Sequence, residues 1–314
     1  MPRPAPYTVG SQTAGFFAVD KDIDGRLMAA FEKSLARFAH RPDVTGIDIG
    51  LKMKRGRHTG RLAIRIHVRE KFQLRHLPAR TRFPRLIDGV PVDVVEAVYV
   101  EHGGGPTPPA RVIRPGMSVG LANRPAGTIG TIASDPAAGC DYLVSAGHVL
   151  ADHAHPGAAV IQPGREDGGR APRDQVGTLQ GINRSCDAAY AVLDGSRAVD
   201  RRAEVSGVVV SGTRYPRIGD ILEKSGCTTK VTRARVDGKG HFYGLKWAFR
   251  LVPLEGQMDP IAAEGDSGSV WYDPVTNEGV GIHCKGGALP ASTMNFAVAT
   301  SLKIVLDEWG LPLS

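Results

Sequence analysis

Three residue types that together make an activated nucleophile occur along this chain in the order histidine, aspartate, serine. His148 lies in Leu-Val-Ser-Ala-Gly-His-Val-Leu, Asp187 in Cys-Asp-Ala-Ala-Tyr-Ala-Val-Leu, and Ser267 in Gly-Asp-Ser-Gly-Ser. A serine hydroxyl is a weak nucleophile near neutral pH, so it needs a base to take its proton and a carboxylate to orient that base. A fold that serves this chemistry must bring three distant segments together, and each segment borders a short strand-like run.

The turn around Ser267 carries glycines that serve a second purpose. Gly265 and Gly268 permit a sharp turn that exposes the serine side chain, and the amide N–H groups of Gly265 and Ser267 can converge on one point. Such a pair of donors would form an oxyanion hole. Asp266 is interpreted as a structural carboxylate that shapes this turn. Gly-Asp-Ser-Gly by itself is also a common turn sequence, so the prediction depends on all three residue types occurring in order.

The chain order and the Gly-Asp-Ser-Gly motif resemble those of the chymotrypsin-like serine peptidases. The resemblance implies that Ser267 attacks, that His148 acts first as base and then as acid, and that Asp187 orients His148. It also implies a mainly β fold of two packed six-stranded antiparallel β-barrels with a C-terminal helix, and a cofactor-free serine endopeptidase acting on proteins or peptides. Two alternatives stay open: an esterase with the same triad, and a non-catalytic protease-fold binding protein.

The N-terminal third has its own pattern, which predicts a small basic α+β domain and a Gly/Pro linker over residues 1–110. Residues 22–39 place apolar side chains at helical spacing, and the glycines and prolines of 103–109 mark the linker. Alternating runs predict strands at 44–51, 62–68 and 90–100. The stretches Thr-Gly-Arg-Leu-Ala-Ile-Arg-Ile-His-Val-Arg-Glu-Lys and Ile-Asp-Gly-Val-Pro-Val-Asp-Val-Val-Glu resemble the leading segment of bacterial trypsin-like proteins and plant narrow-leaf proteins.

The pattern of the remaining sequence predicts two β-barrels. The first covers residues 111–203 and carries His148 and Asp187, and the second covers residues 204–314 and carries Ser267. A total of 39 glycines and 22 prolines fits the many turns of short-stranded β proteins. Residues 299–309 predict a terminal helix. The expected strands lie at 127–132, 142–145, 176–179 and 188–193 in the first barrel, and at 205–210, 230–236, 242–254, 270–272 and 279–284 in the second.

The positive charge of the chain is concentrated near its start. Residues 1–110 hold 18 Lys or Arg against 11 Asp or Glu, which accounts for the whole formal net charge of +7. Between Lys52 and Arg85 there are 12 basic residues and one acid, a pattern that can attract nucleic acid, an anionic membrane surface or an acidic protein. Even spacing of Arg61, Arg65 and Arg69 favours instead a solvated strand face, since no nucleic-acid motif accompanies the charge.

The strand expected after Ser267 bears on substrate choice. Gly281-Ile282-His283 is similar to the Gly-Ile-His segment of glutamyl endopeptidases, which implies that His283 faces an acidic substrate side chain. The alternative is a histidine that packs inside the barrel. A trypsin-like preference for Lys or Arg is not expected, because Ile261 stands where the resemblance would require an acid.

Neither a metal nor a cofactor is expected. Asp152, His153 and His155 lie close in sequence, but histidines at i and i+2 before a proline are typical of a polar loop. No run approaches the roughly 18 apolar residues of a membrane span, and the first residues lack the apolar stretch of a secretory signal. A cytoplasmic protein is therefore expected, in which thiols stay free. The cysteines concerned are Cys140, Cys186, Cys227 and Cys284.

Overall fold

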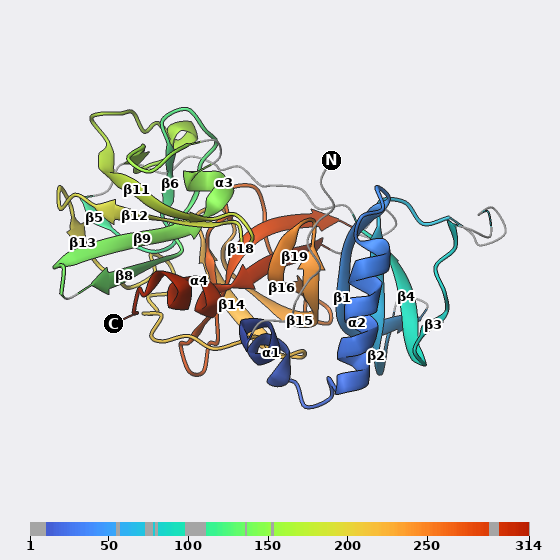
Figure 1. Ribbon diagram of the computed structural model, residues 1–314. Helices are drawn as coiled ribbons and strands as arrows, with labels where there is room; N and C mark the ends of the chain where they lie inside the picture. Colours follow the sequence, from blue (N-terminus) through green and yellow to red (C-terminus); the bar gives the residue numbers. More distant parts are fainter. Residues whose placement is uncertain are drawn as a thin grey trace.

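The computed structural model describes residues 11–54, 57–72, 78, 81–97, 111–135, 137–151, 154–288 and 295–313. The expected linker at 103–109 lies outside these residues. The described chain is mainly β, and its strands form two β units and an N-terminal extension (Figure 1). This confirms the mainly β prediction. No helix in the described ranges is long and apolar enough to cross a membrane.

Residues 11–97 form what we call the N-terminal unit, in which helix α2 covers one face of a small sheet (Figure 1). The side chain of Asp24 caps α2 by accepting the Leu27 N–H at 2.8 Å. Phe31, Leu35 and Phe38 follow the helical period and are buried. The elements are α1 (Ser11–Ala18), α2 (Gly25–Phe38), β1 (Val44–Lys54), β2 (Arg57–Val68), β3 (Leu86–Ile87) and β4 (Val90–Glu96).

The first β unit is a curled sheet of seven strands in the order β7-β6-β10-β11-β12-β9-β8, with β5 and β13 paired beside it. Its strands are β5 (Val112–Ile113), β6 (Ser118–Leu121), β7 (Gly127–Thr128), β8 (Thr131–Asp135), β9 (Cys140–Ala146), β10 (Ala159–Ile161), β11 (Gln175–Asn183), β12 (Ala188–Leu193) and β13 (Ala198–Val199). Helix α3 (Gly147–Leu150) and the short 3₁₀ helix η3 (Arg165–Asp167) belong to the same unit.

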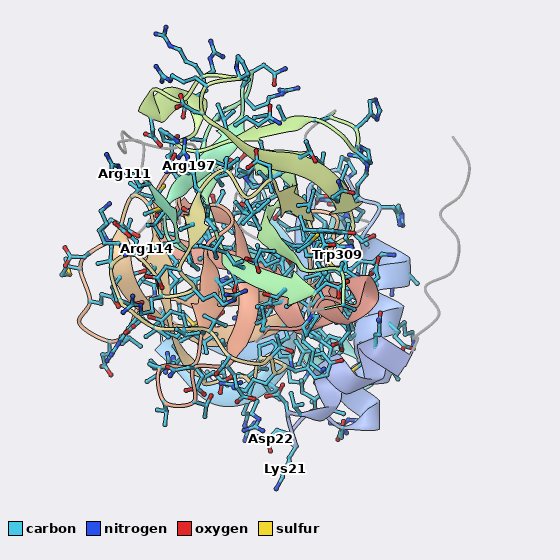
Figure 2. All side chains as sticks on the ribbon, turned by 90° about the vertical axis from the view of Figure 1, so that its left-hand side faces the viewer. Lys21, Asp22, Arg111, Arg114, Arg197 and Trp309 are labelled. Carbon is cyan, nitrogen blue, oxygen red and sulfur yellow. The ribbon has the colours of Figure 1, made fainter. Side chains whose placement is uncertain are left out.

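The second β unit, which we call the second barrel, is a closed barrel of six strands. Its order is β14-β17-β18-β19-β16-β15, and a pairing between β14 and β15 closes it. Helix α4 follows and carries Trp309, which is labelled in Figure 2. The Trp309 ring packs on Tyr190 of the first β unit with ring centroids 4.6 Å apart. The elements are β14 (Ile221–Gly226), β15 (Lys230–Phe242), β16 (Leu245–Val252), β17 (Val270–Tyr272), β18 (Gly279–Ala288), β19 (Asn295–Ser301) and α4 (Leu302–Trp309).

The N-terminal unit continues the sheet of the second barrel. Strand β15 pairs with β14 through its first half and with β1 through its second half, where Gly46 lies opposite Phe242 and Gly50 opposite Gly238. Strands β1, β2, β4 and β3 therefore extend the barrel sheet to ten strands. The N-terminal unit is joined to the second barrel by backbone hydrogen bonds as well as by side-chain packing.

A buried ion network lies at this junction. Arg65 Nε donates to Asp48 Oδ1 at 2.8 Å, and Arg65 Nη1 donates to Asp237 Oδ2 of β15 at 2.9 Å, with all three side chains fully buried. Burial alone would raise the pKa of Asp48, but the charge and hydrogen bonds of Arg65 hold it well below its usual value. The solvated-face interpretation is therefore wrong for Arg65, although Arg61 and Arg69 are exposed.

Several expected elements differ from the structure. The run expected at 127–132 is divided between β7 and β8, and the run expected at 242–254 spans the turn that separates β15 from β16. Residues 205–210 form no strand, since Val205 is 47% and Val209 36% exposed, Gly207 has a φ of +70°, and Val210 alone of the run is buried. The terminal helix begins at Leu302 rather than 299, since the preceding residues form the end of β19, which pairs with both β16 and β18. The four cysteines form no disulfide.

Candidate active site

His148 and Asp187 are held together by two hydrogen bonds. The ring atom Nδ1 of His148 lies 2.7 Å from Asp187 Oδ2, and the backbone N–H of His148 donates to Asp187 Oδ1 at 2.8 Å. Both side chains are largely buried, with 14% and 12% of their surface exposed. A carboxylate at this distance accepts the Nδ1 proton, which leaves Nε2 as the atom able to take a proton from a nucleophile.

The chain positions this pair at the contact between the two β units. His148 lies in α3 directly after β9, and Asp187 lies in the turn between β11 and β12. The Gly147 N–H donates to the Asp187 carbonyl at 2.8 Å, which ties α3 to that turn. Thr300 of β19 donates its hydroxyl to the Cys186 carbonyl at 2.6 Å. The turn is thereby anchored on the second barrel.

Ser267 lies in a turn of the second barrel that packs against the first β unit. The Thr128 N–H donates to the Ser267 carbonyl at 2.7 Å. A Cβ added to Gly268 would clash with Ser145 Oγ and lie 3.0 Å from the backbone nitrogen of Ala146. Since Ala146 ends β9 just before α3, the structure brings the Ser267 turn against the segment that carries the histidine.

The reactive atoms of the serine and the histidine are both buried and without a hydrogen-bond partner in the described part of the chain. These atoms are Ser267 Oγ and His148 Nε2, which do not bond to each other. Hydrogen bonds of this kind are often long or poorly aligned in an unliganded site and tighten when substrate binds. The arrangement therefore leaves a hydroxyl and a basic nitrogen available for a reacting group.

The backbone of the same turn leaves two donors unused. The amides of Asp266, Gly268 and Ser269 donate to backbone carbonyls within 3.1 Å. Those of Gly265 and Ser267 donate to no carbonyl among the described residues. Gly265 and Gly268 have φ values of +95° and +96°, a conformation that strains any residue with a side chain. The turn thus presents two free N–H groups at the position expected for an oxyanion hole.

Asp266 shapes the turn from inside the second barrel. Its carboxylate accepts the backbone N–H groups of Thr228 and Thr229 at 3.1 Å and that of Ala263 at 3.0 Å. Lys224 Nζ donates to Asp266 Oδ2 at 3.0 Å. Burial would raise the pKa of Asp266, but the charge of Lys224 lowers it to about 2. This is the structural role expected for Asp266, whereas Lys224 was not foreseen from the sequence.

His283 lies beside the Ser267 turn and points into the second barrel. The Gly268 N–H donates to the His283 carbonyl, and the His283 N–H donates to the Ser269 carbonyl, both at 2.8 Å. The imidazole is fully buried and meets the Trp271 ring edge-on at 6.3 Å between centroids. Ile261 is fully buried in the same cluster as Trp271. The structure thus places His283 next to the candidate nucleophile and among barrel residues.

The segment with two neighbouring histidines lies partly outside the described residues. Asp152 and His153 lie outside the described residues, while His155 lies within them. Over the described ranges no group of three or more His, Cys, Asp or Glu side chains is arranged to hold a metal ion.

Comparisons with known proteins give similar shapes but no similar sequence. No family model matches the chain, and no curated protein matches its sequence. Among solved structures, Thermobifida fusca protease A has a TM-score of 0.48 and 18% identity, covering 64% of this chain and 98% of that one. A glutamic acid specific serine protease with a histidine triad in substrate binding has a TM-score of 0.48 and 20% identity, covering 64% and 100%. Nocardiopsis protease matches with a TM-score of 0.48, 18% identity and coverages of 64% and 98%.

Proposed function

We propose that this protein is a serine endopeptidase that hydrolyses proteins or peptides through an acyl-enzyme. The observation that carries the proposal is the 2.7 Å contact of His148 Nδ1 with Asp187 Oδ2. It orients the imidazole and leaves His148 Nε2 free, in a site where Ser267 Oγ also lacks a partner among the described residues. A nucleophile, a base and a group that orients the base are the parts that acyl transfer needs.

The proposed reaction uses these groups in sequence. Ser267 Oγ attacks the carbonyl carbon of the substrate while His148 Nε2 takes the hydroxyl proton, and Asp187 stabilises the imidazolium that forms. The free N–H groups of Gly265 and Ser267 stabilise the negative charge on the carbonyl oxygen. His148 then protonates the leaving amine. Water, deprotonated by His148, releases the acyl group and restores Ser267.

We further propose a preference for Glu or Asp before the scissile bond. Support comes from His283, whose backbone is bonded to both residues that follow Ser267. An imidazole can donate a hydrogen bond to a carboxylate, and Ile261 supplies no acid that would favour Lys or Arg. The competing interpretation is a histidine that only packs against Trp271.

Labelling with a fluorophosphonate probe tests the proposed nucleophile. Such probes react covalently with an activated serine hydroxyl, so the parent protein should be labelled and Ser267→Ala should not. Ser269→Ala is the matched control, because Ser269 lies in the same motif but donates its hydroxyl to the Asp266 carbonyl. A folded parent protein that takes up no label would contradict the proposal. Faster hydrolysis of esters alone would favour the esterase alternative.

A further inference from the structure

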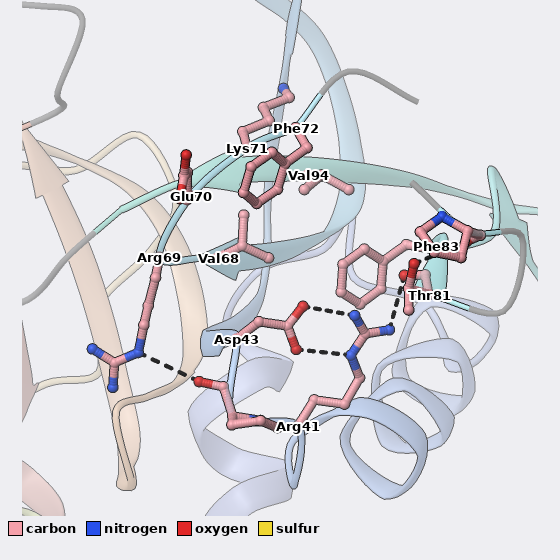
Figure 3. A pocket seen from close by; sticks show the side chains of 12 residues that line it. Arg41, Asp43, Val68, Arg69, Glu70, Lys71, Phe72, Thr81, Phe83 and Val94 are labelled. Carbon is pink, nitrogen blue, oxygen red and sulfur yellow. Dashed lines mark hydrogen bonds and ion pairs between the residues drawn. The ribbon is translucent and has the colours of Figure 1, made fainter. Parts of the chain in front are cut away.

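A cavity of about 940 Å³ lies in the N-terminal unit and includes none of the proposed triad residues. Its volume is in the range of sites that hold organic ligands or several side chains. Val68 at the end of β2, Val94 of β4, Phe72 and Phe83 give it an apolar lining (Figure 3). Phe72 is 51% exposed, although large apolar side chains are usually covered. The cavity therefore offers an uncovered apolar surface.

The edge of β4 beside this cavity is open within the described residues. Strand β4 pairs with β2 from Val92 to Glu96, but β3 pairs with it only at Val90 and Pro91. Beyond Val92, whose N–H donates to the Arg85 carbonyl, no described strand lies on the outer side of β4. An open edge presents backbone N–H and C=O groups to which an extended chain can add as another strand.

One wall of the cavity carries an arginine whose charge is balanced by a neighbouring aspartate. Arg41 forms two hydrogen bonds with Asp43, at 2.9 and 2.6 Å, and its guanidinium stacks on Phe83 at 4.2 Å from the ring centroid (Figure 3). The other charged residues of the lining are Arg69, Glu70 and Lys71, and the excess positive charge belongs to Arg69, whose side chain leads away toward the second barrel (Figure 3).

Tyr243 connects this cavity to the candidate active site. The Arg69 guanidinium lies 5.7 Å from the centre of the Tyr243 ring, and Lys285 Nζ lies 5.8 Å from the same point. Lys285 is on β18, two residues after His283. Figure 3 shows Arg69 pointing away from the cavity toward the second barrel. The exposed Arg69 and the buried Lys285 thus both lie beside Tyr243, between the cavity and the strand that carries His283.

The cavity is also fixed in position relative to that strand. The pairing of β1 with β15 and the buried contacts of Arg65 with Asp48 and Asp237 hold the N-terminal unit on the second barrel. Two sites on one rigid body raise the effective concentration of a chain that reaches both of them.

We propose that this cavity is an exosite that binds an extended, apolar segment of the polypeptide substrate. The segment adds to the open edge of β4 and places apolar side chains against Val68, Val94 and Phe72. Acidic residues in the stretch leading to the scissile bond pass the exposed Arg69. The exosite rests on the proposed peptidase function, because its occupant is the chain that is cut.

Cleavage assays test the exosite with two kinds of substrate. The first kind is a short peptide that contains only the cleaved sequence. The second kind is a set of extended peptides, in which the same sequence is joined to a segment of alternating Leu and Glu. This segment is placed before or after the cleaved sequence, through linkers of graded length. Phe72→Asp should lower kcat/KM for the best extended peptide about tenfold, as expected for losing one large apolar contact, and leave the short peptide unchanged. Met258→Asp is the matched control, because Met258 is 83% exposed and lies outside the cavity lining. An equal effect of Phe72→Asp on both kinds of substrate, or none on either, would overturn the proposal.

Binding measurements separate failure of the exosite from failure of the peptidase. The Ser267→Ala protein is titrated into a fluorescein-labelled peptide of alternating Leu and Glu, and binding is measured by fluorescence anisotropy. This protein should bind the peptide, and adding Phe72→Asp should abolish the binding. Arg69→Gln should weaken binding several-fold, and a Leu and Lys peptide should bind worse. Absence of peptide binding overturns the exosite, whatever the catalytic result. The exosite is also overturned if decanoate displaces the labelled peptide at a lower concentration than unlabelled peptide does, because the cavity would then bind a fatty acid. If the peptide binds but the parent protein takes up no fluorophosphonate label, the exosite is supported and only the proposed hydrolysis is contradicted.

Discussion

Lys224 Nζ lies 3.0 Å from Asp266 Oδ2, and both side chains are fully buried next to the turn that carries Ser267. Thr229 joins the pair by accepting from Lys224 at 2.7 Å and donating to Asp266 at 2.6 Å. The carboxylate then holds three backbone amides, so the shape of the turn depends on one buried charge pair. We interpret Lys224 as a positioning residue for the proposed oxyanion hole.

Replacing Lys224 by methionine should therefore impair turnover more than substrate binding. The uncompensated carboxylate would reorganise the turn and misplace the Gly265 and Ser267 amides, so kcat should fall about a hundredfold, comparable to losing an oxyanion donor. Arg233→Met is the control, because Arg233 is largely exposed and pairs with Glu223. Steady-state kinetics with near-UV circular dichroism measure this. A variant with native spectrum and unchanged kcat would show that Lys224 does not position the turn.

Asp187→Asn should cost about 10⁴ in kcat while leaving the protein folded. The amide would favour the wrong tautomer of His148, so Nε2 would carry a proton and could not act as base. Combining this change with Ser267→Ala should add little, because triad members act as a unit. Activity within tenfold of the parent in Asp187→Asn would exclude the proposed role of the carboxylate.

His283→Ala should remove the proposed preference for acidic residues without abolishing attack by Ser267. A charge-assisted hydrogen bond contributes about 1.5 to 3 kcal/mol, so Glu should exceed a neutral isostere about ten- to a hundredfold in kcat/KM. Cleavage-site profiling on a digested proteome measures the preference directly. Cuts dominated by apolar, small or basic residues would leave His283 as a packing partner of Trp271.

Arg65→Met should destabilise the protein by about 3 to 5 kcal/mol, because it leaves the buried Asp48 carboxylate without its arginine and Asp237 with Arg250 alone. Arg61→Met, four positions earlier on the same strand and exposed, should change stability by less than about 0.5 kcal/mol. Denaturant unfolding of both variants provides the comparison. Similar midpoints for the two would mean that the network at the junction contributes no net stability over an apolar side chain.

Stability should decline between about pH 6.5 and pH 4 because of His241. Burial and the nearby charge of Lys246 lower the pKa of His241 from 6.5 to about 4. The folded state thus disfavours the protonated ring, and its stabilisation, complete above the unfolded pKa, is lost as pH falls toward 4, by about 3 kcal/mol. His241→Gln should flatten this decline, whereas His40→Gln at an exposed site should not. Parallel stability-versus-pH curves for parent and His241→Gln would contradict this assignment.

Local patterns predicted the elements that depend on local order. The helical period of residues 22–39 located α2, and alternation located β1 and β2, because each element buries one face defined by its own sequence. The order of motifs also anticipated that His148 and Asp187 would meet, and the structure brings them to hydrogen-bonding distance.

Features that depend on distant partners could not be predicted in this way. Arg65 fits the spacing of a solvated face, and only its pairing with Asp237, 172 positions later, explains its burial. Lys224 stands between Glu223 and Ser225 in β14, and its partner Asp266 lies 42 positions away in the turn that carries Ser267. Periodicity identifies a face of a strand and not what covers it, so buried charges are where sequence reasoning fails.

Strand β15 is shared by the second barrel and the N-terminal unit, so removing the N-terminal unit would expose part of the barrel sheet. A closed barrel has no free edge, yet here the second half of β15 projects beyond β14 and is covered only by β1 on that side. Removal of the N-terminal unit would uncover this half-strand and take away Arg65, one of the two arginines that face Asp237. Such an edge can pair with another molecule, so a shortened chain would be prone to self-association. The boundary seen in composition near residue 110 is thus not a boundary in hydrogen bonding, because β1 and β15 belong to one sheet.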